Sequence, residues 1–201
     1  MSRAEMPPGW AESLLRLVLK ENDRETVSGD LLEEYRETIV PRRGRRSSHL
    51  WYIRQTAGFV LRAVWPWALL FSGQFLARTA YDWAVPTHDY HVRAEFSTEF
   101  GVTTLLVTAL WMSWRSGSVV AGTLMTAIAS QLAAIVSVSG ASLMLALWPD
   151  PAGHLRQAIA ESGGIEEVYL LPFMMIVPAL IIGTVGGAIG SLSRRLLRFG
   201  S

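Results

Sequence analysis

Residues 118–148 read SVVAGTLMTAIASQLAAIVSVSGASLMLALW and contain no charged side chain. A helix needs about 20 consecutive apolar residues to cross the hydrocarbon layer of a membrane. This stretch is longer, so we expect it either to cross at a strong tilt or to project beyond the bilayer on one side. It decides the fold class, because uninterrupted apolar runs of this length are typical of membrane-spanning helices.

Three further apolar stretches are separated by charged segments and cover about residues 58–78, 100–114 and 168–193. The first is about 31 Å long as a helix, enough for a crossing. Arg62 and Arg78 lie near its two ends, where long side chains can extend to the headgroup layer. The second stretch is short and needs flanking residues or a locally thinner bilayer.

These stretches predict an all-α polytopic membrane protein. We expect a four-helix transmembrane bundle in residues 47–201 and an N-terminal cytoplasmic helical hairpin in residues 1–46. Pro172 and Pro178 are expected to bend the fourth spanning helix, because proline removes a helical hydrogen bond.

The placement of arginine predicts the orientation in the membrane. Arginines precede the first span, follow the fourth, and occupy the short connection between the second and third spans at Arg115. The other two connections each hold one arginine and four acidic residues. Under the positive-inside rule, four crossings with both chain ends in the cytoplasm satisfy all three basic segments. We therefore expect a multi-pass protein of the bacterial inner membrane.

The first 40 residues are net negative, with five basic and nine acidic side chains, and carry two helical patterns. The first pattern places six apolar residues on one face: Trp10, Ala11, Leu14, Leu15, Val18 and Leu19. The second repeats an apolar residue at every fourth position: Val27, Leu31, Tyr35 and Ile39. These patterns predict the two helices of the hairpin. Pro41 is expected to end the second helix, and Trp51 and Tyr52 to lie in the headgroup layer.

The N-terminal residues also resemble a known module. The resemblance is carried by Trp10, Leu14-Leu15, Arg24-Glu25, Gly29-Asp30-Leu31, Glu33-Glu34-Tyr35 and Trp51-Tyr52-x-Arg54-Gln55. This series resembles the permease prefix domain that precedes MacB/FtsX-type ABC permeases in acidobacteria and related bacteria. The match covers about residues 10–56, and the rest of the chain is too short to be such a permease. The resemblance implies a cytoplasmic helical interaction module, not transport by this chain alone.

Within that module, the acidic helix face is the candidate docking surface, with Asp30, Glu33, Glu34 and Tyr35 as its residues. The alternative is a solvated helix face with supporting charge pairs. The basic linker residues Arg42, Arg43, Arg45 and Arg46 set the topology and can bind anionic lipid. We expect no nucleic-acid binding, because no recognition fold or interleaved aromatic residues accompany these arginines.

The connection after the first span contains a candidate metal-binding pattern. His91, Glu95 and Glu99 follow one another at four-residue spacing and, with His88, could hold a divalent cation. Such spacing often arises by chance in polar loops, so our expectation is that no metal is bound. The chain has no cysteine, which excludes disulfides, thiolate metal sites and cysteine catalysis.

Polar and small residues within the spans predict helix packing. Gln131 and the neighbouring serines, among them Ser130, Ser137 and Ser142, are expected to hydrogen-bond to adjacent helices. The fourth span contains two overlapping small-residue motifs, formed by Gly183, Gly186, Gly187 and Gly190. This spacing lets helix backbones approach closely, either within the bundle or between protomers.

No nucleophile with a base, phosphate-binding loop or carboxylate pair lies inside the predicted membrane region. The preferred hypothesis is a non-enzymatic membrane protein without a cofactor, whose cytoplasmic domain docks a permease, an ABC component or a regulator. One alternative is a small transporter or channel subunit that assembles as a homo-oligomer and lines a path with Gln131. The other is a metal-dependent membrane enzyme with its site in the first outer loop.

Overall fold

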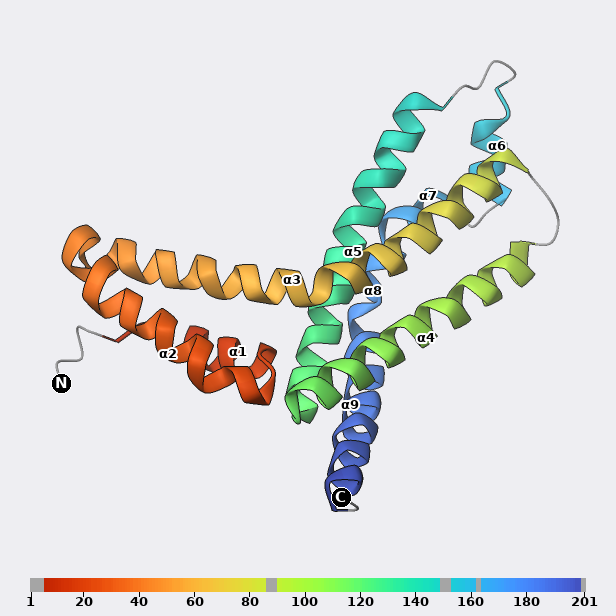
Figure 1. The fold of residues 1–201 in the computed structure, drawn as a ribbon. Helices are drawn as coiled ribbons and strands as arrows, with labels where there is room; N and C mark the ends of the chain where they lie inside the picture. The colour runs from red at the N-terminus through yellow and green to blue at the C-terminus, as the bar shows by residue number, and fades with distance from the viewer. Residues whose placement is uncertain (1–5, 86–89, 149–152, 162–163, 200–201) are drawn as a thin grey trace.

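A computed structural model describes residues 6–85, 90–148, 153–161 and 164–199 of the chain. These residues form an all-α structure, and no strand occurs among them. The elements are α1 (Gly9–Val18), η2 (Glu21–Asp23), α2 (Arg24–Glu34), η3 (Tyr35–Ile39), α3 (Val40–Ala84), α4 (Tyr90–Ser116), α5 (Val119–Leu147), α6 (Leu155–Glu161), α7 (Gly164–Tyr169), α8 (Leu171–Met174) and α9 (Ile176–Phe199). Figure 1 shows a helical bundle with a smaller helical unit beside one end.

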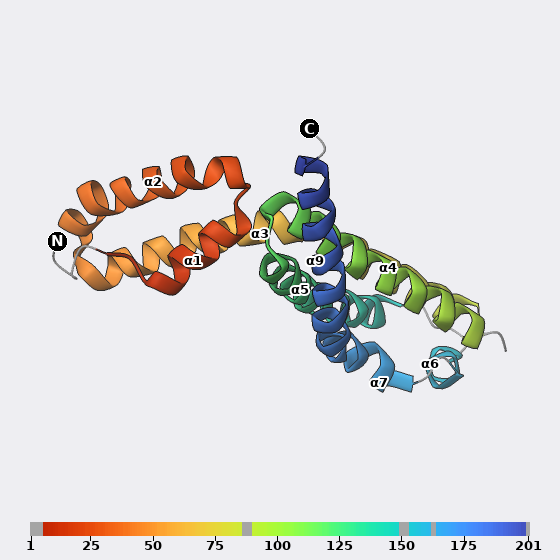
Figure 2. The same cartoon turned by 90° about the horizontal axis from the view of Figure 1, so that it is seen from below.

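The smaller unit consists of α1, α2 with η3, and the first half of α3, and we call it the N-terminal domain (Figure 2). The chain reverses within the first turns of α3, at Gly44, whose φ of 70° is a conformation that favours glycine. Pro41 lies in the first turn of α3, where its missing N–H is tolerated, so the reversal occurs three residues later than predicted.

The core of the N-terminal domain includes a residue beyond the predicted boundary at residue 46. Leu15 of α1, Leu31 of α2 and Tyr35 pack with Tyr52 of α3, and all four are buried. The domain is therefore a three-helix unit instead of a hairpin. The sequence patterns located the inward faces of α1 and α2, although Trp10 is exposed. The patterns did not indicate that the start of α3 is the third helix of this core.

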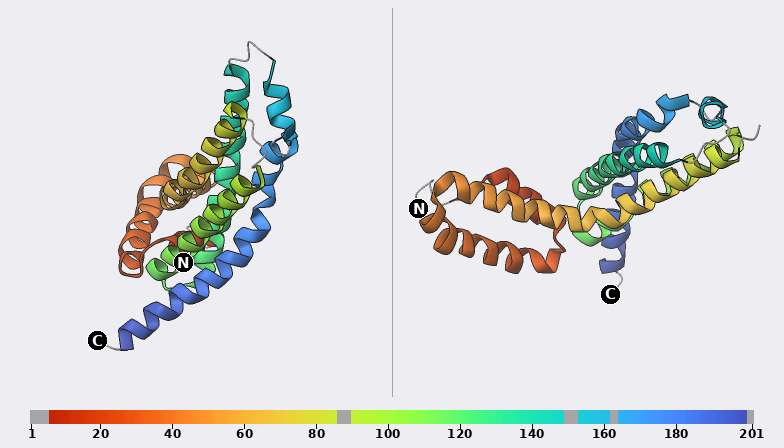
Figure 3. Two further views of the ribbon diagram at one scale, coloured as in Figure 1. Left: turned by 90° about the vertical axis from the view of Figure 1, so that its right-hand side faces the viewer. Right: turned by 90° about the horizontal axis from the view of Figure 1, so that it is seen from above.

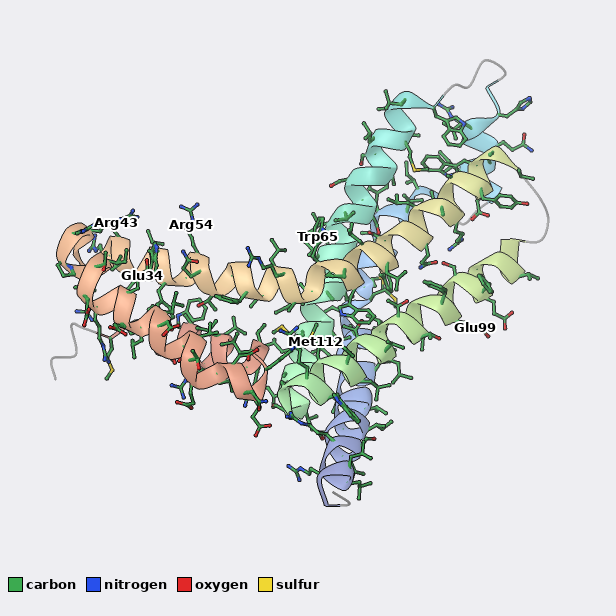
Figure 4. All side chains as sticks on the ribbon, in the orientation of Figure 1. Glu34, Arg43, Arg54, Trp65, Glu99 and Met112 are labelled. Carbon is green, nitrogen blue, oxygen red and sulfur yellow. The ribbon has the colours of Figure 1, made fainter. Side chains whose placement is uncertain are left out.

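The second half of α3 joins α4, α5 and α9 in the bundle, where α9 packs against both α4 and α5. Figure 4 shows α3 changing direction near Trp65, next to Pro66, which cannot donate a backbone hydrogen bond. Three helical segments are long and apolar enough to cross a membrane: 21–84, 119–147 and 172–197. The predicted third span coincides with α5.

The predicted second span, residues 100–114, lies within α4 but is not among those three segments. The helix has ample length, at about 1.5 Å per residue. Its hydrophobicity is reduced by an N-terminal half that contains Glu95 and Glu99 and by threonines further along. The predicted fourth span is divided into α7, α8 and α9 by breaks at Leu170 and Met175, on either side of Pro172 (Figure 3).

The four glycines of the small-residue motifs lie where α9 meets α4 and α5. A Cβ atom on Gly183 would lie 3.0 Å from the Cα of Thr123, and one on Gly186 would lie 2.9 Å from the Cβ of Ala109. A Cβ on Gly190 would lie 2.7 Å from the carbonyl oxygen of Leu110. These helices approach one another within the chain at distances that only glycine permits.

We predict that Gly190→Ala lowers the free energy of unfolding by about 1–3 kcal/mol, because the new methyl group meets backbone that must shift. The matched control is Gly73→Ala in α3, where no atom lies within 4 Å of the added Cβ. Its stability should be unchanged or slightly higher. Unfolding of the two detergent-solubilised variants, followed by circular dichroism, measures their free energies of unfolding. Equal losses of stability in the two variants would contradict the close packing at Gly190.

Candidate functional site

The helices of the N-terminal domain are joined through one carboxylate, that of Glu12 in α1. Ser28 of α2 donates its hydroxyl hydrogen to Glu12 Oε1 at 2.6 Å, and Arg16 Nε donates to the same oxygen at 2.7 Å. Tyr52 of α3 donates its phenolic hydrogen to Glu12 Oε2. A half-buried anion thus holds three helices through charge-assisted hydrogen bonds.

Two opposing effects act on the pKa of Glu12. Burial raises it, whereas the hydrogen bonds from Ser28, Tyr52 and Arg16 lower it, and the net pKa lies below the ordinary value of 4.5. A depressed carboxyl pKa stabilises the folded state at pH values above the ordinary one. That contribution is lost as the pH falls through the lower folded-state pKa. Glu12 therefore stabilises the domain at neutral pH.

Two tyrosines form the centre of this core. Tyr52 was expected in the headgroup layer, whereas Tyr35 was expected both on the apolar face of the second helix and on the docking surface. Both side chains are fully buried. Their rings pack edge to face with centroids 5.6 Å apart. Tyr35 follows Leu31 by one helical turn and so shares its inward face. Tyr35 is therefore a core residue and not part of an exposed surface.

The remaining docking candidates form an acidic surface on α2. Asp30, Glu33 and Glu34 are exposed and take no part in the core, and Figure 4 shows where Glu34 lies on the domain. We call these three residues the α2 acidic surface. It is available to a partner without any change in the fold.

The basic linker forms a turn instead of an extended connection. Arg42, Arg43, Arg45 and Arg46 are all exposed around Gly44, at the tip of the N-terminal domain that lies farthest from the bundle (Figure 4). From there α3 continues for about 18 Å before the predicted span begins at residue 58. These arginines therefore lie at a distance from the bundle.

The opposite end of the domain is attached to the bundle, and we call this contact the junction. Glu21 of η2 accepts a hydrogen bond from Arg194 Nη2 of α9 at 2.6 Å, forming an ion pair. Arg24 Nη2 donates to the carbonyl oxygen of Ser116, at the end of α4, at 2.6 Å. Arg194 was predicted only to set topology. Its partner lies 173 positions away, so no local pattern could have identified the pair.

A second ion pair lies at the other end of the bundle. Arg78 Nε is 3.0 Å from Asp82 Oδ2, and the two side chains are 12% and 2% exposed. The extension of Arg78 to the headgroup layer stays a prediction, and the structure shows that its charge is paired one helical turn away. Beside the pair, a cavity of about 110 Å³ is lined by Gln74, Ser97 and other residues of α3, α4 and α8.

The candidate metal residues are not gathered into a site in the described structure. His88 and the side chain of His91 lie outside the described residues. Glu95 and Glu99 are exposed on α4. Among the residues that are described, no group of three or more His, Cys, Asp or Glu side chains is arranged to hold a metal ion.

The polar residues of α5 differ in their contacts. Gln131 Nε2 donates to the carbonyl oxygen of Phe173 in α8 at 3.3 Å, and Ser142 Oγ donates to Tyr169 Oη in α7 at 3.3 Å. Ser130 and Ser137 are buried, and their hydroxyls have no hydrogen-bond partner among the described residues. The predicted hydrogen bonds between helices are thus present for Gln131 and Ser142 but absent for these two serines.

Comparison with known proteins identifies no relative: no protein family, no curated protein and no solved structure matches this chain. The resemblance of residues 10–56 to the permease prefix domain stays a prediction from the sequence.

We predict that Tyr52→Phe lowers the free energy of unfolding of the N-terminal domain by about 1.5–3 kcal/mol, because a buried hydrogen bond to a charged group is lost. Tyr35→Phe is the matched control, since its hydroxyl makes only a 3.4 Å contact with the carbonyl oxygen of Met6. Its cost should be below about 1 kcal/mol. Hydrogen exchange of the α1 and α2 amides measures the stability of both variants. Equal losses of stability would contradict the role of Glu12 as the anion that joins the three helices.

We also predict that Asp82→Asn lowers the free energy of unfolding by about 3 kcal/mol, because it removes the buried anion that pairs with the largely buried side chain of Arg78. The double variant Arg78→Met/Asp82→Leu should recover most of this loss, since neither charge then remains. Denaturant unfolding in detergent compares the two. A double variant no more stable than the single one would show that the pair does not act as a unit.

Proposed function

We propose that this chain is a non-enzymatic, four-span protein of the bacterial inner membrane whose cytoplasmic N-terminal domain docks a permease, an ABC component or a regulator. The observation that carries the proposal is the α2 acidic surface. It presents three carboxylates from a domain whose core is complete without them. The partner surface is basic, because it has to complement these charges.

The positions of charged residues support the proposed orientation. Arg115 and Arg194 lie at the same end of the bundle, and the N-terminal domain contacts both of their helices there. Asp82, Glu95 and Glu99 belong to the other ends of α3 and α4 (Figure 1). Basic residues at the end of the bundle that the N-terminal domain contacts are what the positive-inside rule expects for cytoplasmic chain ends.

The length and surface of α4 support a fourth crossing. The helix contacts α9 and α5 along the bundle. Trp111, Val107 and Val102 are large apolar side chains that it leaves exposed. A helix that is packed on one face and apolar on the other suits an environment of lipid.

The junction supports transmission of a docking event to the bundle. The α2 acidic surface belongs to the same helix as Arg24, which bonds to the end of α4. Glu21, just before α2, pairs with α9. A partner that displaces α2 therefore acts on both bundle helices through these contacts, as well as through α3, which runs continuously from the domain into the bundle.

The test is in-membrane crosslinking of the full chain, followed by affinity capture and identification of the captured protein. The wild type should capture a permease, an ABC component or a regulator, and Glu33→Lys/Glu34→Lys should lose it because charge complementarity is reversed. Point variants are preferable to deletion of residues 1–46, because that deletion would uncover Tyr52, which is buried in the domain core.

The matched control is Glu95→Lys/Glu99→Lys, which makes the same change of charge on exposed residues of α4. It should retain the partner. If both variants lose the partner equally, capture depends on net charge, which would contradict docking at α2. If the wild type captures only its own copies, docking is abandoned and an oligomeric transporter or channel subunit becomes the better hypothesis.

A further inference from the structure

At the junction, an open cavity of about 300 Å³ lies between the N-terminal domain and the bundle. One wall is the α1–α2 connection, with Lys20 and Glu21. The opposite wall is the end of α4, with Trp111, Trp114 and Arg115, and Arg194 of α9 completes it. The cavity therefore lies where a soluble domain meets helices that cross or border the membrane.

Its charge balance favours an anion. Three cations and one carboxylate line the cavity, and the carboxylate of Glu21 already pairs with Arg194. Lys20 has no side-chain partner among the described residues. The Nε of Arg115 is buried and has no hydrogen-bond acceptor there. Arg115 lines the cavity and is not paired with a carboxylate among the described residues, so an anionic oxygen in the cavity would complement its charge.

The aromatic lining indicates what the anion is attached to. Trp111 and Trp114 line the cavity and are 54% and 42% exposed. Tryptophan is enriched at the boundary between hydrocarbon and headgroups, where its ring can contact acyl chains while its N–H stays near polar groups. Basic residues and interfacial tryptophans around one cavity are therefore suited to a molecule with an anionic head and an apolar tail.

We propose that this cavity binds the phosphate of an anionic phospholipid, held between Lys20 and Arg115, with the acyl chains lying along Trp111 and Trp114. Cationic pockets between membrane helices on the cytoplasmic side are a recurring form of anionic headgroup site. A bound headgroup links the α1–α2 connection to α4, in addition to the polar contacts of Glu21 and Arg24 and the apolar packing of Val18 against α4 and α5. This inference rests on the membrane placement proposed above but not on docking of a protein partner.

The experiment is native mass spectrometry of the full chain purified in detergent, with phosphatidylglycerol and phosphatidylcholine of identical acyl chains as probes. The wild type should retain phosphatidylglycerol preferentially. The variant Lys20→Gln/Arg115→Gln should bind it about 10-fold to 30-fold more weakly, because two cations near the headgroup are lost. The single variant Lys20→Gln, at an exposed position, should show an intermediate loss with unchanged helicity.

The matched control is Arg45→Gln/Arg46→Gln, which removes two exposed charges at the far tip of the domain and should leave binding unchanged. Equal weakening in the control and the cavity variant would overturn the site in favour of general charge attraction. No preference for phosphatidylglycerol in the wild type would overturn it as well. Inorganic phosphate serves as a second probe. If it displaces the lipid at equal concentration, the occupant is free phosphate and the lipid assignment fails.

Because the cavity variants leave Glu33 and Glu34 intact, failure of this inference is distinguishable from failure of the proposed function. If Lys20→Gln/Arg115→Gln loses lipid selectivity but still captures the partner, the result supports the cavity as the lipid site and leaves docking at α2 intact. Lipid selectivity retained in Glu33→Lys/Glu34→Lys would support the cavity as a site independent of docking.

Discussion

The close contact of α9 with α4 and α5 is the constraint on which the remaining arrangement depends. Apolar side chains gain little by leaving lipid, so helices in a membrane associate through close packing, and here glycine permits it. Gly183 and Gly190 meet main-chain atoms of the neighbouring helices. This packing sets how far α9 extends beside the α4–α5 turn. Arg194 therefore reaches both the carbonyl oxygen of Arg115 and the carboxylate of Glu21.

The N-terminal domain depends on a different interaction. Three short helices enclose a small core, and such cores are only marginally stabilised by apolar burial. The Glu12 carboxylate compensates by accepting hydrogen bonds from α2 and α3 as well as from its own helix. Because Tyr52 belongs to the helix that continues into the bundle, the domain cannot fold without defining the direction of α3. Domain and bundle are thus joined by a shared helix and by the junction, and not by a flexible linker.

Charged side chains elsewhere in the chain differ in whether they are paired within the structure. Arg78 and Asp82 pair inside the structure, whereas the arginines at Gly44 remain solvated at the tip of the domain. Arg115 lies between these extremes, with a buried nitrogen and no acceptor among the described residues.

The sequence by itself determined the all-α class, the extent of α5 and the inward faces of α1 and α2. These properties depend on local hydrophobicity and on the 3.6-residue period of the helix, both of which are readable in a short window. Tertiary structure alone decided that Tyr35 and Tyr52 share a core, that Arg78 is paired, and that Glu21 meets Arg194. Each of these depends on where other helices lie. In the case of Glu21 the two partners are 173 positions apart, and only the folded chain brings them together.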